Sequence, residues 1–298
     1  MTVKIEELKK IRNYFLEHDK TTFEHHAHNF LNDLIDSLEI SNRFEQQVIP
    51  KNAELLRNND LLNTIMVGDA EAKLREIPDN FVNLIFTSPP YNVGIEYDNY
   101  NDNQDFEVYL AKLERMFVEC IRVLSEGGHL VIQIGNLFKN PYIPLTDYIV
   151  MMLKDKANYK GEIIWDKGNT VKNTAWGSWL SANKPSTRDT HEYLLIFRKD
   201  GERIGESDIT SDEFIEYTKG IWRVKPETTD VGHPAPFPKE LAMRVIKLYS
   251  FKHETILDPF CGSGTTCDVA KKLGRNYIGI DLSKRYSNLA FDRLNTLL

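Results

Sequence analysis

From Thr64 onward the sequence alternates short apolar runs with longer amphipathic stretches, and this alternation limits the possible folds more than any other feature of the chain. Strands that alternate with helices are joined by crossover connections, which produce a mainly parallel sheet with helices on both faces. The pattern therefore predicts an α/β, doubly wound domain. The predicted strands are 64–67, 81–87, 129–135, 161–165, 191–198, 255–257 and 277–280, and the predicted helices are 70–76, 106–124, 147–155, 265–273 and 283–297.

Two parts of the chain lie outside this alternation. Apolar residues recur every three or four positions between Ile5 and Leu38, which predicts helices with one apolar side. We therefore expect residues 1–62 to form an N-terminal helical extension with a structural or dimerisation role, and residues 63–298 to form the main domain. Within it, about 167–190 is rich in Asn, Ser, Thr, Trp and Gly without a clear period, which is typical of a long functional loop or small insertion.

Composition and charge exclude several classes of protein. The 298 residues include 37 Lys and Arg against 44 Asp and Glu, a formal net charge of −7, so nucleic acid could be bound only by a local face. No apolar run is long enough to cross a bilayer, and the first residues lack the apolar stretch of a signal peptide. Three cysteines without CxxC spacing argue against disulfides and zinc and fit a reducing cytoplasm, and we expect no metal site.

A glycine turn follows the predicted strand 255–257. Gly262 and Gly264, in the sequence DPFCGSG, remove side-chain bulk, so that a ligand can approach the backbone there. Asp281 ends the next strand, where a carboxylate is well placed to receive two ribose hydroxyls. Asp258, before the glycines, suits a ligand with a cationic amino group. These features predict a nucleoside site, and S-adenosylmethionine has the adenosine and the amino group without a phosphate.

A dinucleotide dehydrogenase is the main rival interpretation of this turn. Such enzymes use a third glycine to pack the helix that binds pyrophosphate, and Cys267 stands at that position here. A turn that serves only packing is the other alternative. The acidic residue Asp281 follows Gly264 at the spacing that a ribose site needs, which favours the nucleoside site.

A second corner follows the predicted strand 81–87, where the sequence continues Ser88-Pro89-Pro90-Tyr91. The two prolines lack N–H groups and fix φ, which makes a rigid turn with outward-pointing carbonyls as acceptors. Ser88 adds a hydroxyl acceptor and Tyr91 adds a flat ring. Rigid acceptors beside an aromatic ring suit a planar substrate with an NH₂ group, because they accept its two hydrogens while the ring stacks on the heterocycle.

Together, the two corners resemble those of the DNA methyltransferases that modify adenine N6 or cytosine N4. The catalytic tetrapeptide of that family has the form (D/N/S)-P-P-(Y/F), which residues 88–91 match, and DPFCGSGTT is similar to its cofactor motif. The tetrapeptide precedes the cofactor motif here, which is the permuted order of the family's β group. The resemblance covers about residues 64–298 and implies a Rossmann-like methyltransferase sheet with circularly permuted motif order.

Three further segments resemble motifs of the same family. Gly68-Asp69 resembles the acidic turn that contacts the cofactor's adenine, and 191–199 resembles the strand behind the target-base pocket. The segment 233–238, followed by a predicted helix at 240–249, resembles the part that closes over methionine. The resemblance thus implies S-adenosyl-L-methionine as the cofactor. The implied cofactor-binding residues are Asp69, Ala70, His233, Pro236, Phe237, Asp258, Phe260, Gly262, Gly264, Thr265 and Asp281.

The resemblance also implies a mechanism, in which one base rotates out of duplex DNA and its exocyclic amine is methylated. That amine is a poor nucleophile because its lone pair is delocalised into the ring. Hydrogen bonds from the NH₂ group to Ser88 and to the Pro89 carbonyl would localise the lone pair, while Pro90 stiffens the turn and Tyr91 holds the base. Serine at position 88 favours cytosine N4 in the family, and adenine N6 is the alternative.

The segment 167–190 is predicted to read the DNA sequence, because its side chains are of the kinds that bond base edges and phosphates or wedge into a base stack. A structural loop with its tryptophans packed on the core is the alternative. The expected partner is double-stranded DNA. A cognate restriction endonuclease is a possible functional partner, and a homodimer is also possible. The predicted DNA-binding residues are Lys172, Asn173, Trp176, Trp179, Lys184 and Arg188.

Other functions fit the sequence less well. Cytosine C5 methylation needs a thiolate, typically in a Pro-Cys pair, and the sequence contains no Pro-Cys. An RNA or protein amide methyltransferase would use a similar tetrapeptide, but the permuted order and the 233–238 segment favour DNA. A non-catalytic DNA-binding module would not need both corners intact.

Overall fold

The structure of the protein is a computed structural model that describes residues 60–295 except 138–140, 169–176, 188, 228–231, 233 and 235. The chain divides into two units, Met1–Asn58 and Asn59–Leu298, and the described residues belong to the second. The predictions made for residues 1–59 lie outside the described part. No helix among the described residues combines the length and apolarity that a bilayer-spanning segment needs.

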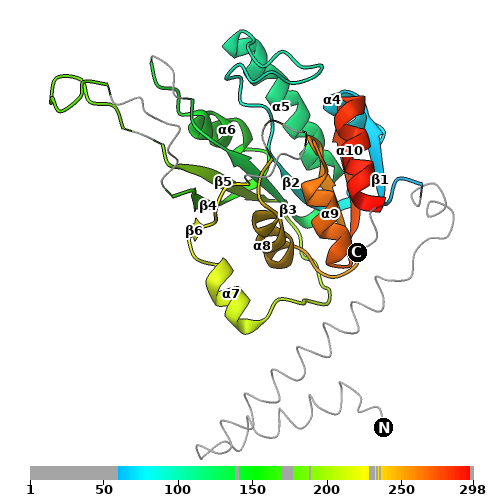
Figure 1. Ribbon diagram of the computed structural model, residues 1–298. Helices are drawn as coiled ribbons and strands as arrows, with labels where there is room; N and C mark the ends of the chain where they lie inside the picture. Colours follow the sequence, from blue (N-terminus) through cyan, green and yellow to red (C-terminus); the bar gives the residue numbers. More distant parts are fainter. Residues whose placement is uncertain are drawn as a thin grey trace, which may run out of the picture. The chain divides into compact units, whose positions relative to one another are not determined.

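Eight strands of the described part form one sheet with the order β1-β8-β7-β2-β3-β5-β4-β6 (Figure 1). Every neighbouring pair is parallel except the two that involve β5, which runs antiparallel to β3 and β4. The predicted doubly wound, mainly parallel sheet is confirmed. The strands are β1 Thr64–Val67, β2 Val82–Thr87, β3 Leu124–Ile134, β4 Asn158–Asp166, β5 His191–Arg198, β6 Ile221–Arg223, β7 Thr255–Asp258 and β8 Asn276–Asp281.

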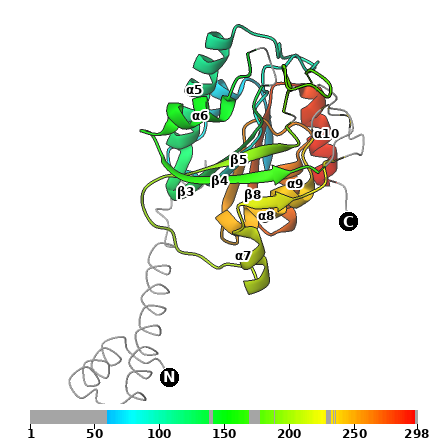
Figure 2. The same ribbon diagram turned by 90° about the vertical axis from the view of Figure 1, so that its left-hand side faces the viewer.

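Helices cover both faces of this sheet (Figure 2). Successive strand residues point to opposite faces, so Ile85 of β2 belongs to one core while Leu84 and Phe86 belong to the other. Because β2 is buried on both faces, its sequence is nearly continuously apolar. The helices on the Ile85 face are α4 Ala70–Leu74, α5 Phe106–Val123 and α6 Leu145–Leu153, and those on the other face are α7 Ser211–Tyr217, α8 Lys239–Tyr249, α9 Thr265–Lys272 and α10 Lys284–Asn295.

The observed elements differ from the predicted ones in two main places. β3 begins at Leu124, directly after α5, because the strand bulges: Val82 pairs with Leu124 and Leu84 with His129. Gly127, with a φ of 68°, accommodates this bulge in the left-handed region. α7 and β6 were not predicted, since elements of seven and three residues are too short for a clear period.

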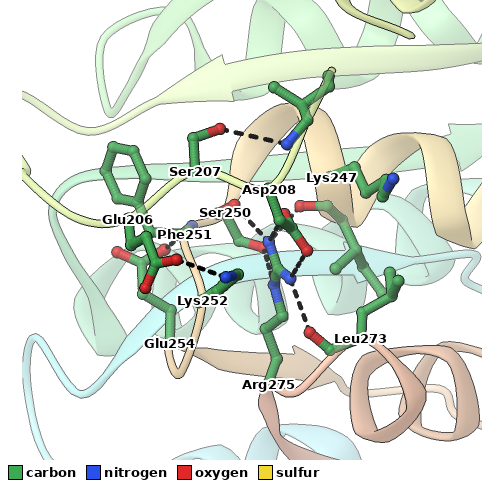
Figure 3. A network of polar contacts seen from close by, with 12 residues as sticks. Glu206, Ser207, Asp208, Lys247, Ser250, Phe251, Lys252, Glu254, Leu273 and Arg275 are labelled. Atoms are coloured by element: carbon green, nitrogen blue, oxygen red, sulfur yellow. Dashed lines mark hydrogen bonds and ion pairs between the residues drawn. The ribbon is translucent and has the colours of Figure 1, made fainter.

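A buried ion pair fastens the segment before α7 to the amino end of β8 (Figure 3). The fully buried Arg275 guanidinium donates to both oxygens of Asp208 over 2.5 and 2.7 Å. It also donates to the carbonyls of Ser250 and Leu273, which end α8 and α9. One side chain therefore holds three segments together at the edge of the sheet opposite the carboxyl ends of the parallel strands.

Candidate active site

The two corners singled out in the sequence lie side by side. β2 and β7 are adjacent parallel strands, with Leu84 paired to Ile256 and Ile85 to Leu257, so the turns after their carboxyl ends meet at one edge. The Thr87 hydroxyl at the end of β2 donates to Asp258 Oδ1 at the end of β7 over 2.8 Å. Residues that are far apart in the sequence thus form a single site.

A cavity of about 430 Å³ lies at this edge. That volume is in the range of small-molecule sites, and the carboxyl edge of a parallel sheet is where such folds bind ligands. The turns after β1, β2, β7 and β8 border it. The predicted site residues that line the cavity are Asp69, Ala70, Ser88, Pro89, Pro90, Tyr91, Pro236, Phe237, Phe260, Gly262, Thr265 and Asp281. Asp258 and Gly264 do not line it, and His233 lies outside the described residues.

The two glycines of the 262–264 turn have different roles. Gly262, with a φ of 50°, borders the cavity, and its N–H donates to Asp281 Oδ2 over 2.9 Å. Gly264 is the N-cap of α9, with a φ of 79°, and a Cβ at this position would lie 2.7 Å from the Ala290 Cβ of α10. Gly264 is therefore needed for a left-handed turn and for close helix packing.

The Asp281 carboxylate is held by the backbone. Besides Gly262, Ser283 N donates to it, to Oδ1 over 2.8 Å. Burial raises the pKa of this carboxyl above its ordinary value. Each oxygen has one protein donor and keeps a lone pair that can accept from a ligand hydroxyl in the cavity.

The Asp258 carboxylate joins the two corners. It is 1% exposed, Oδ1 accepts from Thr87 and from Phe260 N, and Oδ2 accepts from the Thr266 hydroxyl over 2.7 Å. Burial raises its pKa to about 6. Its direct contact with the amino group of a ligand stays a prediction, because its oxygens bond to the protein and its side chain does not line the cavity.

The two proline carbonyls of the Ser-Pro-Pro-Tyr turn, both expected to be outward-pointing acceptors, differ in the structure. The Pro90 carbonyl accepts from the Tyr109 hydroxyl over 2.8 Å, whereas no described residue donates to the Pro89 carbonyl. The Tyr91 hydroxyl lies 3.4 Å from Ser88 Oγ. Burial, and then the nearby Glu192 carboxylate, raise the pKa of Tyr91, so its phenol stays protonated.

Four residues around Tyr91 were missed as site residues: Trp165, Lys167, Gln133 and Glu192 all line the cavity. Gln133 Nε2 donates to the Tyr91 hydroxyl over 2.7 Å, and that hydroxyl donates to Glu192 Oε2 over 3.3 Å. A signal for Gln133 was present, because it is a polar residue within the buried apolar run 130–134 at the end of the strand.

A loop at 92–104 was also missed, although it covers part of the cavity. Its Asp102 side chain is 2% exposed and accepts from the backbone N–H groups of Asn92, Val93 and Ile95 over 2.8 to 3.1 Å. This carboxylate shapes the loop so that Tyr97 and Tyr100 line the cavity. The segment has no helical or strand period, so its contribution was not readable from the sequence.

The described part of the 167–190 segment includes a closed turn at 177–187. Ser178 N donates to the Lys184 carbonyl over 2.8 Å, and Lys184 N donates to Ser178 Oγ. Lys184 is exposed, and Trp179 is 65% exposed, so this tryptophan is not packed on the core. The other predicted DNA-binding residues lie outside the described residues: Lys172, Asn173, Trp176 and Arg188.

Comparisons with known sequences point to one family. The profile of the family described as DNA methylase, of the N6/N4 class, matches residues 82–292. The Type II methyltransferase M.HinfI of Haemophilus influenzae is 30% identical over 262 residues, covering 80% of this chain and 70% of that protein. The Type II methyltransferase M.MjaVI of Methanocaldococcus jannaschii is 34% identical over 190 residues, covering 61% of this chain and 92% of that protein.

Solved structures share the architecture. A Thermus thermophilus chain assigned as a DNA modification methylase, complexed with S-adenosyl-L-methionine, is 29% identical with a TM-score of 0.64 and covers 78% of this chain and 93% of its own. The cytosine-N4-specific PvuII DNA methyltransferase has a TM-score of 0.63 at 19% identity, covering 78% of this chain and 87% of its own. The likeness to the PvuII enzyme shows a common fold.

Proposed function

Because the chain belongs to the DNA methylase family of the N6/N4 class, we propose that it transfers the methyl group of S-adenosyl-L-methionine to the exocyclic amine of a base in double-stranded DNA. One observation carries the proposal: the 88–91 turn and the glycine turn border the same cavity. The first has acceptors for an amino group, and the second has the features of a nucleoside site. A transferase needs both ligands in contact.

The charge of the cavity supports this cofactor. Among its described lining residues, the acids Asp69, Glu71, Glu192 and Asp281 outnumber the bases Lys112 and Lys167. Asp69 pairs with Lys112, Glu192 with Lys167, and Glu71 with Arg75 and Arg115, so Asp281 is the acid that has no ion pair with a described residue. Both lining lysines are thus engaged, which disfavours a dinucleotide, whose pyrophosphate needs basic or N–H partners.

Particular residues would hold the cofactor. The Asp281 carboxylate accepts the ribose hydroxyls, since its two oxygens are fixed by the backbone at the carboxyl end of β8. Asp69 and Ala70 contact the adenine, and His233, Pro236 and Phe237 cover the methionine. When bound, S-adenosyl-L-methionine supplies a methyl group that its sulfonium activates.

The chain's own residues act on the amine. The Ser88 hydroxyl and the Pro89 carbonyl accept the two N–H hydrogens, which draws the nitrogen toward tetrahedral geometry and localises its lone pair. The base is rotated out of the duplex, and the Tyr91 ring holds it by stacking. No covalent intermediate is needed, because positioning and electrostatics supply the catalysis.

Cytosine N4 is the favoured target, because Ser88 is the first residue of the tetrapeptide. Purified chain, labelled S-adenosyl-L-methionine and duplex DNA would be incubated, and the digested nucleosides analysed by mass spectrometry. N4-methylcytosine is expected. N6-methyladenine would move the assignment to the alternative base, and transfer to RNA or protein amides but not to DNA would refute the substrate class.

Segment 167–190 reads the DNA sequence in this proposal. The solvent-exposed Trp179 and Lys184 on the closed turn support it, because an aromatic ring and a cation are the side chains that contact base stacks and phosphates. Exchanging the segment with that of a relative should move the methylated site, and an unmoved site would contradict the assignment. If a restriction endonuclease is the functional partner, that endonuclease should cut the same site in unmethylated DNA but not in DNA methylated by this chain. Sedimentation would test whether the chain forms a homodimer.

A further inference from the structure

We propose that Gln133, Glu192 and Lys167 form a relay of positioning residues that holds Tyr91 and connects it to the base of the 167–190 segment. The inference rests on the proposed function, because it assigns these residues to the methyl-transfer site. It concerns this chain's own contacts, which come from β3, from β5 and from the residue after β4.

The Tyr91 hydroxyl is fixed from two neighbouring strands. It accepts from Gln133 Nε2 over 2.7 Å and donates to Glu192 Oε2 over 3.3 Å, and Gln133 Nε2 also donates to Glu192 Oε2. Gln133 is 3% exposed, so it has little water to bond with in place of these partners. The hydroxyl is therefore used by the protein, and the ring is left for the substrate.

The ring also has little room to shift. A Cβ at Gly135 would lie 3.3 Å from Tyr91 Cε2 and 3.2 Å from Glu192 Cγ, so the ring and the Glu192 stem both pack against this part of the backbone. Contact on the edge of the ring and hydrogen bonds at its tip together fix its orientation. A residue that stacks on a base must be held in this way for the amine to reach its acceptors.

Lys167 completes the relay. Its ammonium forms an ion pair with Glu192 Oε1 and lies 4.6 Å from the centroid of the Trp165 ring, which it faces. Trp165 is 3% exposed, and its Nε1 donates to the Val224 carbonyl over 2.8 Å. Lys167 therefore neutralises a carboxylate that would otherwise stand beside the phenol without a counter-charge, and a rigid ring holds its ammonium in place.

The relay lies at the base of the 167–190 segment. Lys167 N donates to the Thr190 carbonyl over 3.0 Å, which closes the two ends of the segment, and Glu192 follows two residues later. A displacement of the segment's base would therefore act on Glu192, which bonds to the Tyr91 hydroxyl and pairs with Lys167. This geometry connects the part of the chain proposed to read DNA with the residue proposed to hold the base.

A double-mutant cycle tests the relay. Single-turnover methyl transfer to duplex DNA would be measured at saturating S-adenosyl-L-methionine for wild type, Lys167→Met, Tyr91→Phe and the double variant. Each single change is expected to lower the rate about tenfold, and the double variant about tenfold as well, since residues that act through one another are not additive. A loss of about a hundredfold in the double variant would overturn the relay.

Lys219→Met provides the matched control. Lys219 forms an ion pair with Glu216 over 2.5 Å on the exposed face of α7, away from the cavity, so its loss should leave the rate unchanged alone and in combination with Tyr91→Phe. Calorimetric titration should give the same cofactor affinity for all variants within about twofold, because the relay contacts the base side of the cavity. If the wild type transfers no methyl group, both the proposed function and the relay are overturned. If it does transfer, but the effects of Lys167→Met and Tyr91→Phe on the rate are additive, the relay alone is overturned.

Discussion

Thr87 and Asp258, the last residues of two adjacent parallel strands, share a hydrogen bond of 2.8 Å from hydroxyl to carboxylate. The Ser-Pro-Pro-Tyr turn starts at the next residue after Thr87. The second Asp258 oxygen accepts from Thr266, in the first turn of α9. One buried carboxylate therefore sets the position of both turns that border the cavity.

Thr87→Val should weaken this junction. The change keeps the shape but removes a donor from a buried carboxylate, which should lower the free energy of unfolding by about 1–3 kcal/mol. The rate of methyl transfer should also fall, because Ser88 is no longer held against β7. Urea unfolding and single-turnover assays would measure the two effects. Thr87→Ser keeps the hydroxyl and should retain both the wild-type free energy of unfolding and the wild-type rate. Wild-type values for Thr87→Val would contradict the junction.

Asp258 should make stability depend on pH. Burial raises its folded-state pKa to about 6, above the ordinary carboxyl value of about 3.9, so the folded chain binds this proton more tightly than the unfolded chain. The resulting stabilisation is complete below about pH 4 and is lost as the pH rises through 6, about 3 kcal/mol in all. Urea unfolding of wild type and Asp258→Asn would be measured from pH 4 to 7.5. The free energy of unfolding of wild type minus that of the variant should fall as the pH rises. A difference that does not change with pH would contradict the prediction.

Tyr91→Ala should abolish methyl transfer. Removing the ring leaves the rotated base without its stacking partner, and the expected loss is at least about a hundredfold in single-turnover rate. Cofactor affinity should stay within about twofold of the wild type, as read by calorimetric titration. Unchanged turnover would refute the role assigned to the tetrapeptide.

Asp281→Asn should weaken cofactor binding. The amide retains one acceptor for the backbone donors but loses the charge that strengthens bonds to ribose hydroxyls, so the dissociation constant should rise about tenfold. Calorimetric titration with S-adenosyl-L-methionine would measure it, with the exposed Asp212→Asn as the matched control. Equal affinities for the two variants would remove Asp281 from the cofactor site.

Asp208→Ala should destabilise the fold without touching the cavity. The change leaves the fully buried Arg275 guanidinium without its carboxylate, which should cost about 3 kcal/mol in urea unfolding. Lys252→Ala breaks the neighbouring exposed pair with Glu206 and should leave the unfolding midpoint unchanged (Figure 3). If the two variants unfold alike, the ion pair does not fasten the segment as described.

The middle of the sheet was predictable because its strands are largely buried on both faces and read as apolar runs. β5 has the predicted bounds, and β2 starts one residue later than predicted. The edge strand β1 also has the predicted bounds, although its residues are only partly buried or exposed. The start of β3 was wrong because Gly127-Gly128 signals a helix end in the sequence but forms a bulge in the structure. α7 was missed even though Thr210 and Glu213 form a capping box, because the helix has only seven residues.

The two turns could be picked out from the sequence because each is a local motif. The structure brings residues 88–91 and Phe260, Gly262 and Thr265 of the glycine turn to one cavity, while the roles assigned to these residues stay predictions. Gln133, Glu192 and Lys167 were not named individually as site residues from the sequence, although Glu192 lies in the 191–199 strand and Lys167 begins the 167–190 segment. Their contacts with one another depend on which strands become neighbours. Asp258 was assigned to the cofactor site from the sequence, but its bonds to Thr87 and Thr266 depend on which strands become neighbours and could not be predicted in the same way.

The pairing of β2 with β7 also governs how the protein is made. Thr87 and Asp258 are 171 positions apart, so the middle of the sheet stays open while the intervening chain is translated. At ~5–20 residues per second, that interval lasts ~10–30 s. A nascent chain therefore contains the 88–91 turn long before the glycine turn is synthesised, and the cavity that both turns border can close only after β7 and β8 have been made.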